Sequence, residues 1–198
     1  MRKLVLALLC LCAPLCSAQT NDALKASTAA RSQIGVTTIY DPAYSRMAYP
    51  MGDVPMARGV CSDVVIRAYR KVGVDLQQLV HQDMRAHFSA YPKIWGLKKP
   101  DSNIDHRRVP NLEVFFKRQR KALQLPQVSD SYKPGDIVSW RLDNGLAHIG
   151  IISDKKSMFG SRPLVIHNIG QGTQEEDVLF SWKIVGHYRW FNNTGAGR

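Results

Sequence analysis

Cysteine is almost absent from this 198-residue chain once its first 18 residues are set aside. Three of the four cysteines lie in that opening segment, and Cys61 is the fourth. A single remaining cysteine forms no intramolecular disulfide in an oxidising compartment. Cys61 is therefore either a small buried hydrophobe or a nucleophile kept for its chemistry.

Long apolar runs are also missing after the first one. Residues 1–3 are a basic start, residues 4–15 are almost entirely apolar, and Ala18 is the small residue that signal peptidase requires. We therefore expect residues 1–18 to be a signal peptide, cleaved or retained, and residues 19–198 to be one domain in the periplasm or outside the cell. No later stretch approaches the roughly 18 apolar residues of a membrane span, so none is expected after cleavage.

Acidic residues are few, with 16 Asp and Glu against 27 Lys and Arg. Residues 1–18 contain two of the basic residues and no acidic one, so the rest of the chain carries 25 − 16 = +9. That charge favours polyanionic partners such as cell-wall polymers. Nucleic acid is not expected as a partner, because the chain is exported and has neither zinc-finger spacing nor an RNA-binding aromatic motif.

Apolar residues recur with helical spacing in the first two thirds of the chain and with strand spacing afterwards. Helices are predicted at 20–33, at 61–72, from Asp75 onward and from Pro110 onward. Strands are predicted at 136–141, 148–152, 164–167, 177–180 and 184–190, and residues 36–60 and 91–109 are expected to be irregular. This order predicts an α+β fold in which N-terminal helices pack on a C-terminal antiparallel sheet of about five strands.

Cys61 lies at the start of a predicted helix, directly after the loop residues Gly59 and Val60. The unpaired N–H groups and the positive dipole end of a helix stabilise a thiolate there. Such positions lower a thiol pKa from about 8.5 to about 3.5–7.5. The placement therefore favours a nucleophilic role, although buried structural cysteines are also common.

A cysteine nucleophile needs a base, and the base needs a group that orients it. His148 begins a strand after a predicted hairpin turn, and His167 ends the next strand, where Asn168 follows it. Adjacent antiparallel strands bring such side chains together. The alternatives are histidines that merely satisfy their own hydrogen bonds, or a zinc site of Cys61, His148 and His167. Because no close Cys-x-x-Cys or His-x-x-x-His pair accompanies them, no metal or cofactor is expected.

A resemblance joins these residues to a known group. Cysteine at a helix start, then Pro-Gly-Asp-Ile-Val (134–138), His-Ile-Gly-Ile-Ile (148–152) and Ile-His (166–167), resembles the NlpC-type cell-wall cysteine hydrolases, which have a papain-like fold. The match spans roughly residues 45 to 190. The amino-acid sequence at residues 59–65, 103–112 and 167–170 is similar to that of a bacterial family of unknown function allied to that group.

The resemblance implies that Cys61 attacks, that His148 is the base and that His167 orients it. It also implies a tyrosine upstream of the cysteine, and Tyr49 matches that place as a contributor to the oxyanion site. Asn168 and Asp63 are further candidate substrate or oxyanion residues. The sequence departs from the usual pattern at Asp63, where the group has glycine, and residues 81–130 are longer than a minimal member needs.

The longer segment contains two consecutive arginines, Arg107 and Arg108. Arginine binds carboxylates through two parallel hydrogen bonds, so both are candidate clamps for carboxylate-rich stem peptides. Solvated charges, or an internal ion pair with Asp101 or Asp105, are the alternatives. His106 is the second choice for the base.

The resemblance implies an exported cysteine hydrolase that cleaves an amide bond in peptidoglycan through a thioacyl intermediate, as a stem-peptide endopeptidase or an amidase. We expect peptidoglycan or its muropeptides as partner, and a monomer. Two rivals stay open. One is an acyl or peptidyl transferase with the same Cys–His site. The other is a non-catalytic, basic wall-binding domain in which Cys61 is simply buried.

Overall fold

The computed structural model describes residues 14–126, 128–158 and 160–191. Most of the predicted signal peptide, residues 1–13, lies outside the described residues. Residues 14–18 belong to the first helix, α1 (Pro14–Arg31), so cleavage after Ala18 stays a prediction. Within the described ranges, no helix combines the length and apolar character that a membrane crossing needs.

The four predicted helices are present, as α1, α2 (Cys61–Arg70), α3 (Leu76–His87) and α4 (Val109–Arg118). The carboxylate of Asp75 caps α3 by accepting the N–H of Gln77. Gly73 turns the chain after α2 with a positive φ of 79°. Three short 3₁₀ helices cover Phe88–Ala90 (η1), Asp105–Arg107 (η2) and Ser129–Ser131 (η3).

The last third of the chain forms a five-stranded sheet in the order β6-β5-β4-β3-β7. Its strands are β3 (Ile137–Arg141), β4 (Ala147–Lys156), β5 (Pro163–Asn168), β6 (Thr173–Glu176) and β7 (Lys183–Tyr188). All four neighbouring pairs are antiparallel. The predicted α+β class is therefore confirmed.

One predicted strand is wrong. Residues 177–180 form a bend and a turn, in which the Ser181 N–H bonds the Val178 carbonyl at 3.0 Å. The fourth strand is instead β6, which precedes them. Its residues are all polar, so it lacks the apolar alternation that marks a strand, and it pairs with β5 as an edge strand. The short parallel pair β1 (Ile39–Tyr40) and β2 (Arg58–Gly59) lies in a segment that was expected to be irregular.

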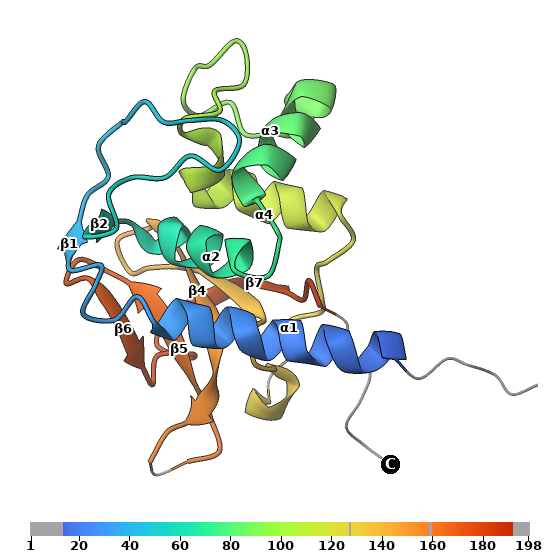
Figure 1. The fold of residues 1–198 in the computed structure, drawn as a ribbon, viewed down its shortest axis with the longest axis vertical. Coiled ribbons are helices and arrows are strands. Elements are labelled where there is room, and N and C mark those ends of the chain that lie inside the picture. Colours follow the sequence, from blue (N-terminus) through green and yellow to red (C-terminus); the bar gives the residue numbers. More distant parts are fainter. Residues whose placement is uncertain (1–13, 127, 159, 192–198) are drawn as a thin grey trace, which may run out of the picture.

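The helices cover one face of the sheet, with α1 and α2 side by side and α3 and α4 beyond α2 (Figure 1). Ile149 and Ile151 of β4 pack into the core on the helix side. Trp140 and Ile152 belong to a second, smaller core on the opposite face. Alternation along each strand thus separates residues that point toward the helices from those that point away.

Candidate active site

Cys61 is the first residue of α2, and its side chain is 5% exposed. The helix start is fixed by Asp63, whose carboxylate accepts the N–H of Val60 at 2.7 Å. Arg107 holds that carboxylate with two hydrogen bonds of 2.9 Å. Asp63 therefore secures the loop and helix that carry the thiol, a positioning role rather than contact with substrate.

The sulfur of Cys61 lies against β4, where the N–H of Ile149 faces it, together with the N–H groups of Ser62 and of Cys61 itself. The N–H of Ile152 bonds toward β3, to the carbonyl of Asp136. Because backbone groups alternate sides along a strand, the N–H of Ile149 points toward β5 instead.

The pairing of β4 with β5 begins only at Ile151 and Ile166 and continues away from Ile149. The N–H of Ile149 thus lies beyond the end of this ladder, where it is available to the sulfur. The thiol of Cys61 accordingly occupies the open end between two strands, next to the backbone that carries His148.

Burial raises the pKa of the Cys61 thiol to about 12. The N–H of Ile149 acts in the opposite direction, and the charge of Asp63 adds to the rise. The expectation of a lowered pKa at the helix start is therefore wrong for this structure, because removal from water outweighs the favourable N–H groups.

His148, His167 and Glu176 form a chain of hydrogen bonds across three neighbouring strands. The Nε2 atom of His148 lies 2.9 Å from Nδ1 of His167, and Nε2 of His167 lies 2.9 Å from the Glu176 carboxylate. The side chain of Glu176 is 44% exposed, and an ionised carboxylate only accepts hydrogen bonds. His167 therefore donates from Nε2 and accepts at Nδ1, so His148 donates from Nε2 and keeps the Nδ1 lone pair for use as a base.

The pKa values of both imidazoles are shifted downward. Burial lowers the pKa of His148 to about 3, and the neighbouring charge of His167 contributes. Burial also lowers the pKa of His167, while the Glu176 carboxylate acts against this shift. Both rings are therefore neutral at neutral pH. Sequence analysis missed Glu176, since it belongs to the unpredicted strand β6.

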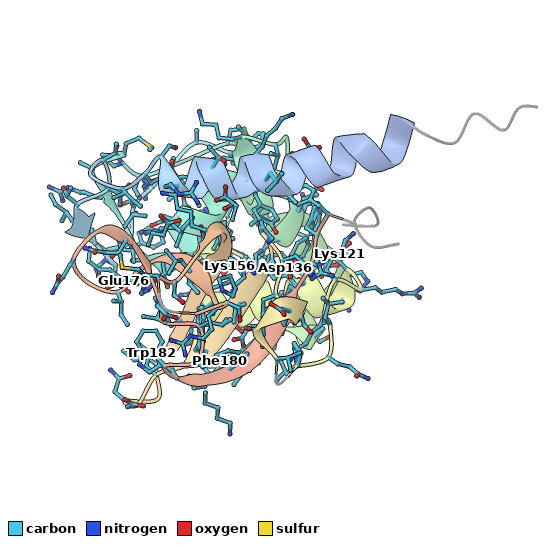
Figure 2. All side chains as sticks on the ribbon, turned by 90° about the horizontal axis from the view of Figure 1, so that it is seen from below. Lys121, Asp136, Lys156, Glu176, Phe180 and Trp182 are labelled. Atoms are coloured by element: carbon cyan, nitrogen blue, oxygen red, sulfur yellow. The ribbon has the colours of Figure 1, made fainter. Side chains whose placement is uncertain are left out.

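Two tryptophans enclose the imidazole pair. Trp140 and Trp182 lie with their ring centroids 5.7 Å and 5.8 Å from that of His148, and Trp182 is 6.2 Å from His167. Figure 2 shows Glu176 and Trp182 at the same end of the sheet. The rings shield the hydrogen bonds of the chain from water, which strengthens them.

His148 pairs with Trp140 across β3 and β4 and shares its face of the sheet, opposite to α2. Cys61 contacts this strand from the helix side and lines a pocket with Ala147. The sulfur is therefore beside the backbone on both sides of His148. Among the described residues, no hydrogen bond joins the sulfur to an imidazole, so proton transfer requires the side chains to meet around the end of β4.

The space beside Gly150, two residues after His148 on β4, is filled by the neighbouring strand β5. A Cβ atom at Gly150 would meet the Val165 side chain at 2.8 Å and the Cβ of His167 at 3.2 Å. Glycine at this position thus allows β5 to approach closely. The result is that His167 packs tightly enough to reach His148.

A pocket of about 420 Å³ opens over Cys61. Its walls include the aromatic residues Tyr40, Tyr44 and Trp95. Burial raises the pKa of Tyr40 to about 12, and the thiol of Cys61 adds to the rise. Tyr40 pairs in register with Gly59, two residues before Cys61, which brings it to the site.

Tyr49 is not brought to Cys61. Its ring packs edge-on against His81 of α3, with centroids 5.0 Å apart, and it does not line the pocket. Tyr40 and Tyr44 are the tyrosines that line the pocket, and the pKa of Tyr40 responds to the Cys61 thiol. Tyr40 and Tyr49 lie close together in the sequence, and the pairing of β1 with β2 brings only Tyr40 to the loop before Cys61.

The other predicted residues have positioning roles or lie elsewhere. Asn168 donates to the carbonyl of Gly59 at 3.2 Å, which ties β5 to the loop before Cys61. His106 is 2% exposed and outside the pocket lining, and burial lowers its pKa to about 3. It is therefore poorly placed as a base for Cys61.

The two candidate arginines differ. Arg107 pairs with Asp63, a partner that was not expected, and its side chain is 2% exposed. Arg108 lies 3.4 Å from Asp105, one of the expected partners, and its side chain is 18% exposed. Both line the pocket. In the part of the chain that the structure describes, no group of three or more His, Cys, Asp and Glu side chains is arranged to hold a metal ion.

These observations define an α+β protein with a buried thiol beside a histidine–histidine–glutamate chain. The chain belongs to the family described as "Domain of unknown function (DUF1287)", whose profile matches residues 27–190. The predicted membership of a bacterial family of unknown function is thereby confirmed.

Two further proteins are similar to this chain. The "Uncharacterized protein YijF" of Escherichia coli (strain K12) is 62% identical over 173 residues, which cover 87% of this chain and 84% of that protein. Among solved structures, "Structure of NlpC1 from Trichomonas vaginalis" is similar with a TM-score of 0.46 and 15% identity. That match covers 86% of this chain and 44% of the other, so this chain spans less than half of its length.

Proposed function

We propose that this protein is an exported cysteine hydrolase that cleaves an amide bond of peptidoglycan in the stem peptide, as an endopeptidase or amidase. One observation carries the proposal. A lone cysteine at a helix start lies at the floor of a pocket, against the strand segment from which His148 begins an oriented chain to His167 and Glu176.

The reaction begins when Nδ1 of His148 takes the proton of the Cys61 thiol and the sulfur attacks the amide carbon. The C–N bond then breaks, and the leaving amine takes the proton from His148. Water, activated by the same imidazole, hydrolyses the thioester and restores the thiol. Each proton taken by His148 is returned within the cycle.

Two backbone N–H groups stabilise the oxyanion: that of Cys61 at the helix start and that of Ile149 at the open end of the strand. The hydroxyl group of Tyr40 is a neighbouring donor. A donor of this kind contributes about 2.7–4 kcal/mol to the transition state. Tyr40 takes the place that the resemblance gave to Tyr49.

The resting site contains a neutral thiol and neutral imidazoles. The raised pKa of Cys61 and the lowered pKa of His148 both disfavour a preformed thiolate–imidazolium pair. Proton transfer thus accompanies attack on a bound carbonyl and does not precede it. The thiol of the unoccupied enzyme then reacts only slowly with oxidants and alkylating agents, since the thiolate is the reactive form.

Three features support peptidoglycan as the substrate: the signal-like residues 1–18, the excess of basic residues and the resemblance of the cysteine and histidine motifs to cell-wall hydrolases. A basic protein is attracted to anionic wall polymers.

Digestion of purified sacculi, with the soluble products resolved by mass, tests the proposal. We expect the wild type to release fragments and both Cys61→Ala and His148→Gln to release none, while the exposed-site control Lys99→Ala behaves like the wild type. Release that persists in Cys61→Ala would remove the mechanism. Product masses that shift upon addition of a free amine would indicate the transferase instead.

A further inference from the structure

Arg107 and Arg108 are consecutive residues in the wall of the same pocket, but their guanidinium groups are used differently. All three nitrogens of Arg107 donate to acceptors of the protein. Nε and Nη2 bond Asp63, Nη2 also bonds the carbonyl of Asp41, and Nη1 bonds the carbonyl of Ala43. A substrate could bind Arg107 only if the hydrogen bonds between Arg107 and Asp63, which fix the start of α2, were broken.

Arg108 makes a single, long hydrogen bond within the described residues, from Nη1 to Asp105 at 3.4 Å. Burial raises the pKa of Asp105 to about 6 in spite of this neighbour, as expected for a weak pairing. A guanidinium has five N–H donors, so most of those of Arg108 lack a protein acceptor.

Trp95 supports the guanidinium of Arg108 from one side. The central carbon of the guanidinium, Cζ, lies 4.2 Å from the centroid of the Trp95 ring, within the range of a cation–π contact. Stacking fixes the plane of the group and leaves its edge free, which is the edge that binds a carboxylate through two parallel hydrogen bonds.

The size of the pocket also limits the distance between the guanidinium of Arg108 and the thiol of Cys61. A sphere of 420 Å³ is about 9 Å across, and an extended peptide advances about 3.3–3.6 Å per residue, so two or three residues fill it. Because Cys61 and Arg108 both line this space, a carboxylate held by Arg108 belongs to a residue next to the amide that the sulfur attacks.

We propose that Arg108, stacked on Trp95, forms a carboxylate-binding subsite, and that the substrate is a peptide with a free carboxylate beside the scissile amide. The inference rests on the proposed function for the reaction, and the subsite itself is testable without it. Peptides in which that carboxylate is converted to a carboxamide are then poor substrates, since the amide offers no charge to the guanidinium.

Alkylation of Cys61 measures the subsite independently of hydrolysis. Iodoacetate carries a carboxylate and iodoacetamide a carboxamide, and both react with the thiolate by displacement of iodide. The ratio of their rates cancels the reactivity of the thiol. We expect the ratio in the folded protein to exceed that in the urea-unfolded protein by about ten-fold or more, with saturation in iodoacetate.

Arg108→Gln should reduce the ratio to the unfolded value, and Arg108→Lys should retain part of the preference. The matched control is Arg85→Gln, which removes one exposed positive charge of α3 outside the pocket. An unchanged ratio in Arg108→Gln, or an equal loss in Arg85→Gln, would overturn the subsite.

Hydrolysis of paired carboxylate and carboxamide peptides completes the test. A carboxylate preference that disappears in Arg108→Gln supports the subsite, and equal cleavage of both peptides overturns it. If neither peptide is cleaved but the iodoacetate preference persists, the proposed hydrolase fails and the anion subsite stands.

Discussion

The sheet carries three buried histidines on the face away from α2, and they belong to two hydrogen-bonded clusters that end at different carboxylates. His148 begins a chain through His167 to the partly exposed Glu176. His187 of β7 bonds Asp136 directly at 2.7 Å, and both of these side chains are 1% exposed. A histidine–carboxylate pair therefore occurs twice, and only the cluster that contains His148 adjoins the strand segment whose backbone faces the Cys61 sulfur.

The second cluster is closed on itself. The carboxylate of Asp136 accepts from His187, from Arg189 through two nitrogens and from the N–H of Lys133. Tyr132 covers the His187 ring, with centroids 4.4 Å apart. Both carboxylate oxygens accept from protein donors, so Asp136, directly before β3, is joined to β7 and to the preceding loop. The two clusters thus differ in their surroundings: protein donors enclose Asp136, whereas the other cluster begins on the strand segment that faces Cys61.

The same substitution at His148 and at His187 should give the largest difference between the two clusters. His148→Gln should lower kcat/KM on peptidoglycan fragments by about 10²–10⁴-fold, the usual worth of a general acid–base group. His187→Gln keeps an amide donor for Asp136 and should change kcat/KM little. Steady-state kinetics of both variants with equal folded fractions checks this, and a comparable loss in both would deny the distinction.

The closed cluster should dominate stability. Asp136→Asn leaves Arg189 without its charge partner and removes the carboxylate that His187 contacts, and breaking such a buried network costs about 3–5 kcal/mol. Urea unfolding followed by circular dichroism measures the loss. The control is Asp177→Asn, which removes a surface ion pair with Arg162 and should cost about 0–1 kcal/mol. Equal losses would show that Asp136 is not structurally special.

The pH dependence of stability should carry the signature of His148. Its pKa falls from an ordinary 6.5 to about 3 on folding, so between these values the unfolded chain binds a proton that the folded chain does not. Stability from this group is therefore complete above pH 6.5 and is lost as pH falls toward 3.

From pH 7 to 4.5 the wild type should lose about 2 kcal/mol more than His148→Gln in urea unfolding. The difference between the two proteins removes the contributions of other groups, such as Asp105, whose raised pKa acts with the opposite sign. Parallel pH profiles would mean that His148 is not buried as a neutral ring.

The sequence predicted what depends on local periodicity and missed what depends on contacts between distant segments. Helical spacing located α2 and its leading Cys61, and strand spacing located His148 and His167. The partner of Arg107 could not be predicted, because Asp63 lies 44 residues away. The thiol pKa was predicted in the wrong direction, because burial at the end of β4 outweighs a helix-start effect that is visible locally.

Glu176 shows the same limit at the candidate site. It belongs to a strand of four polar residues, Thr173–Glu176, which has no apolar alternation and is defined only by pairing with β5. The strand expected at 177–180 does not include Glu176. Because the edge strand β6 was not predicted, Glu176, the last member of the hydrogen-bond chain, was not predicted either.

The smallest expected effect concerns Glu176, whose loss should separate orientation from proton transfer. Glu176→Gln keeps an acceptor for Nε2 of His167 but removes the charge, so we expect kcat/KM to fall about ten-fold, or roughly 1.4 kcal/mol, with little change in KM.

The carboxylate of Glu176 opposes the lowering of the His167 pKa. Its removal should thus move the acidic limb of the pH–rate profile to lower pH, because the imidazoles are harder to protonate. Asp177→Asn, which neutralises the adjacent carboxylate paired with Arg162, should leave that limb in place. A Glu176→Gln profile that only scales down without shifting would assign Glu176 to stability of the sheet edge and leave the two imidazoles to act without it.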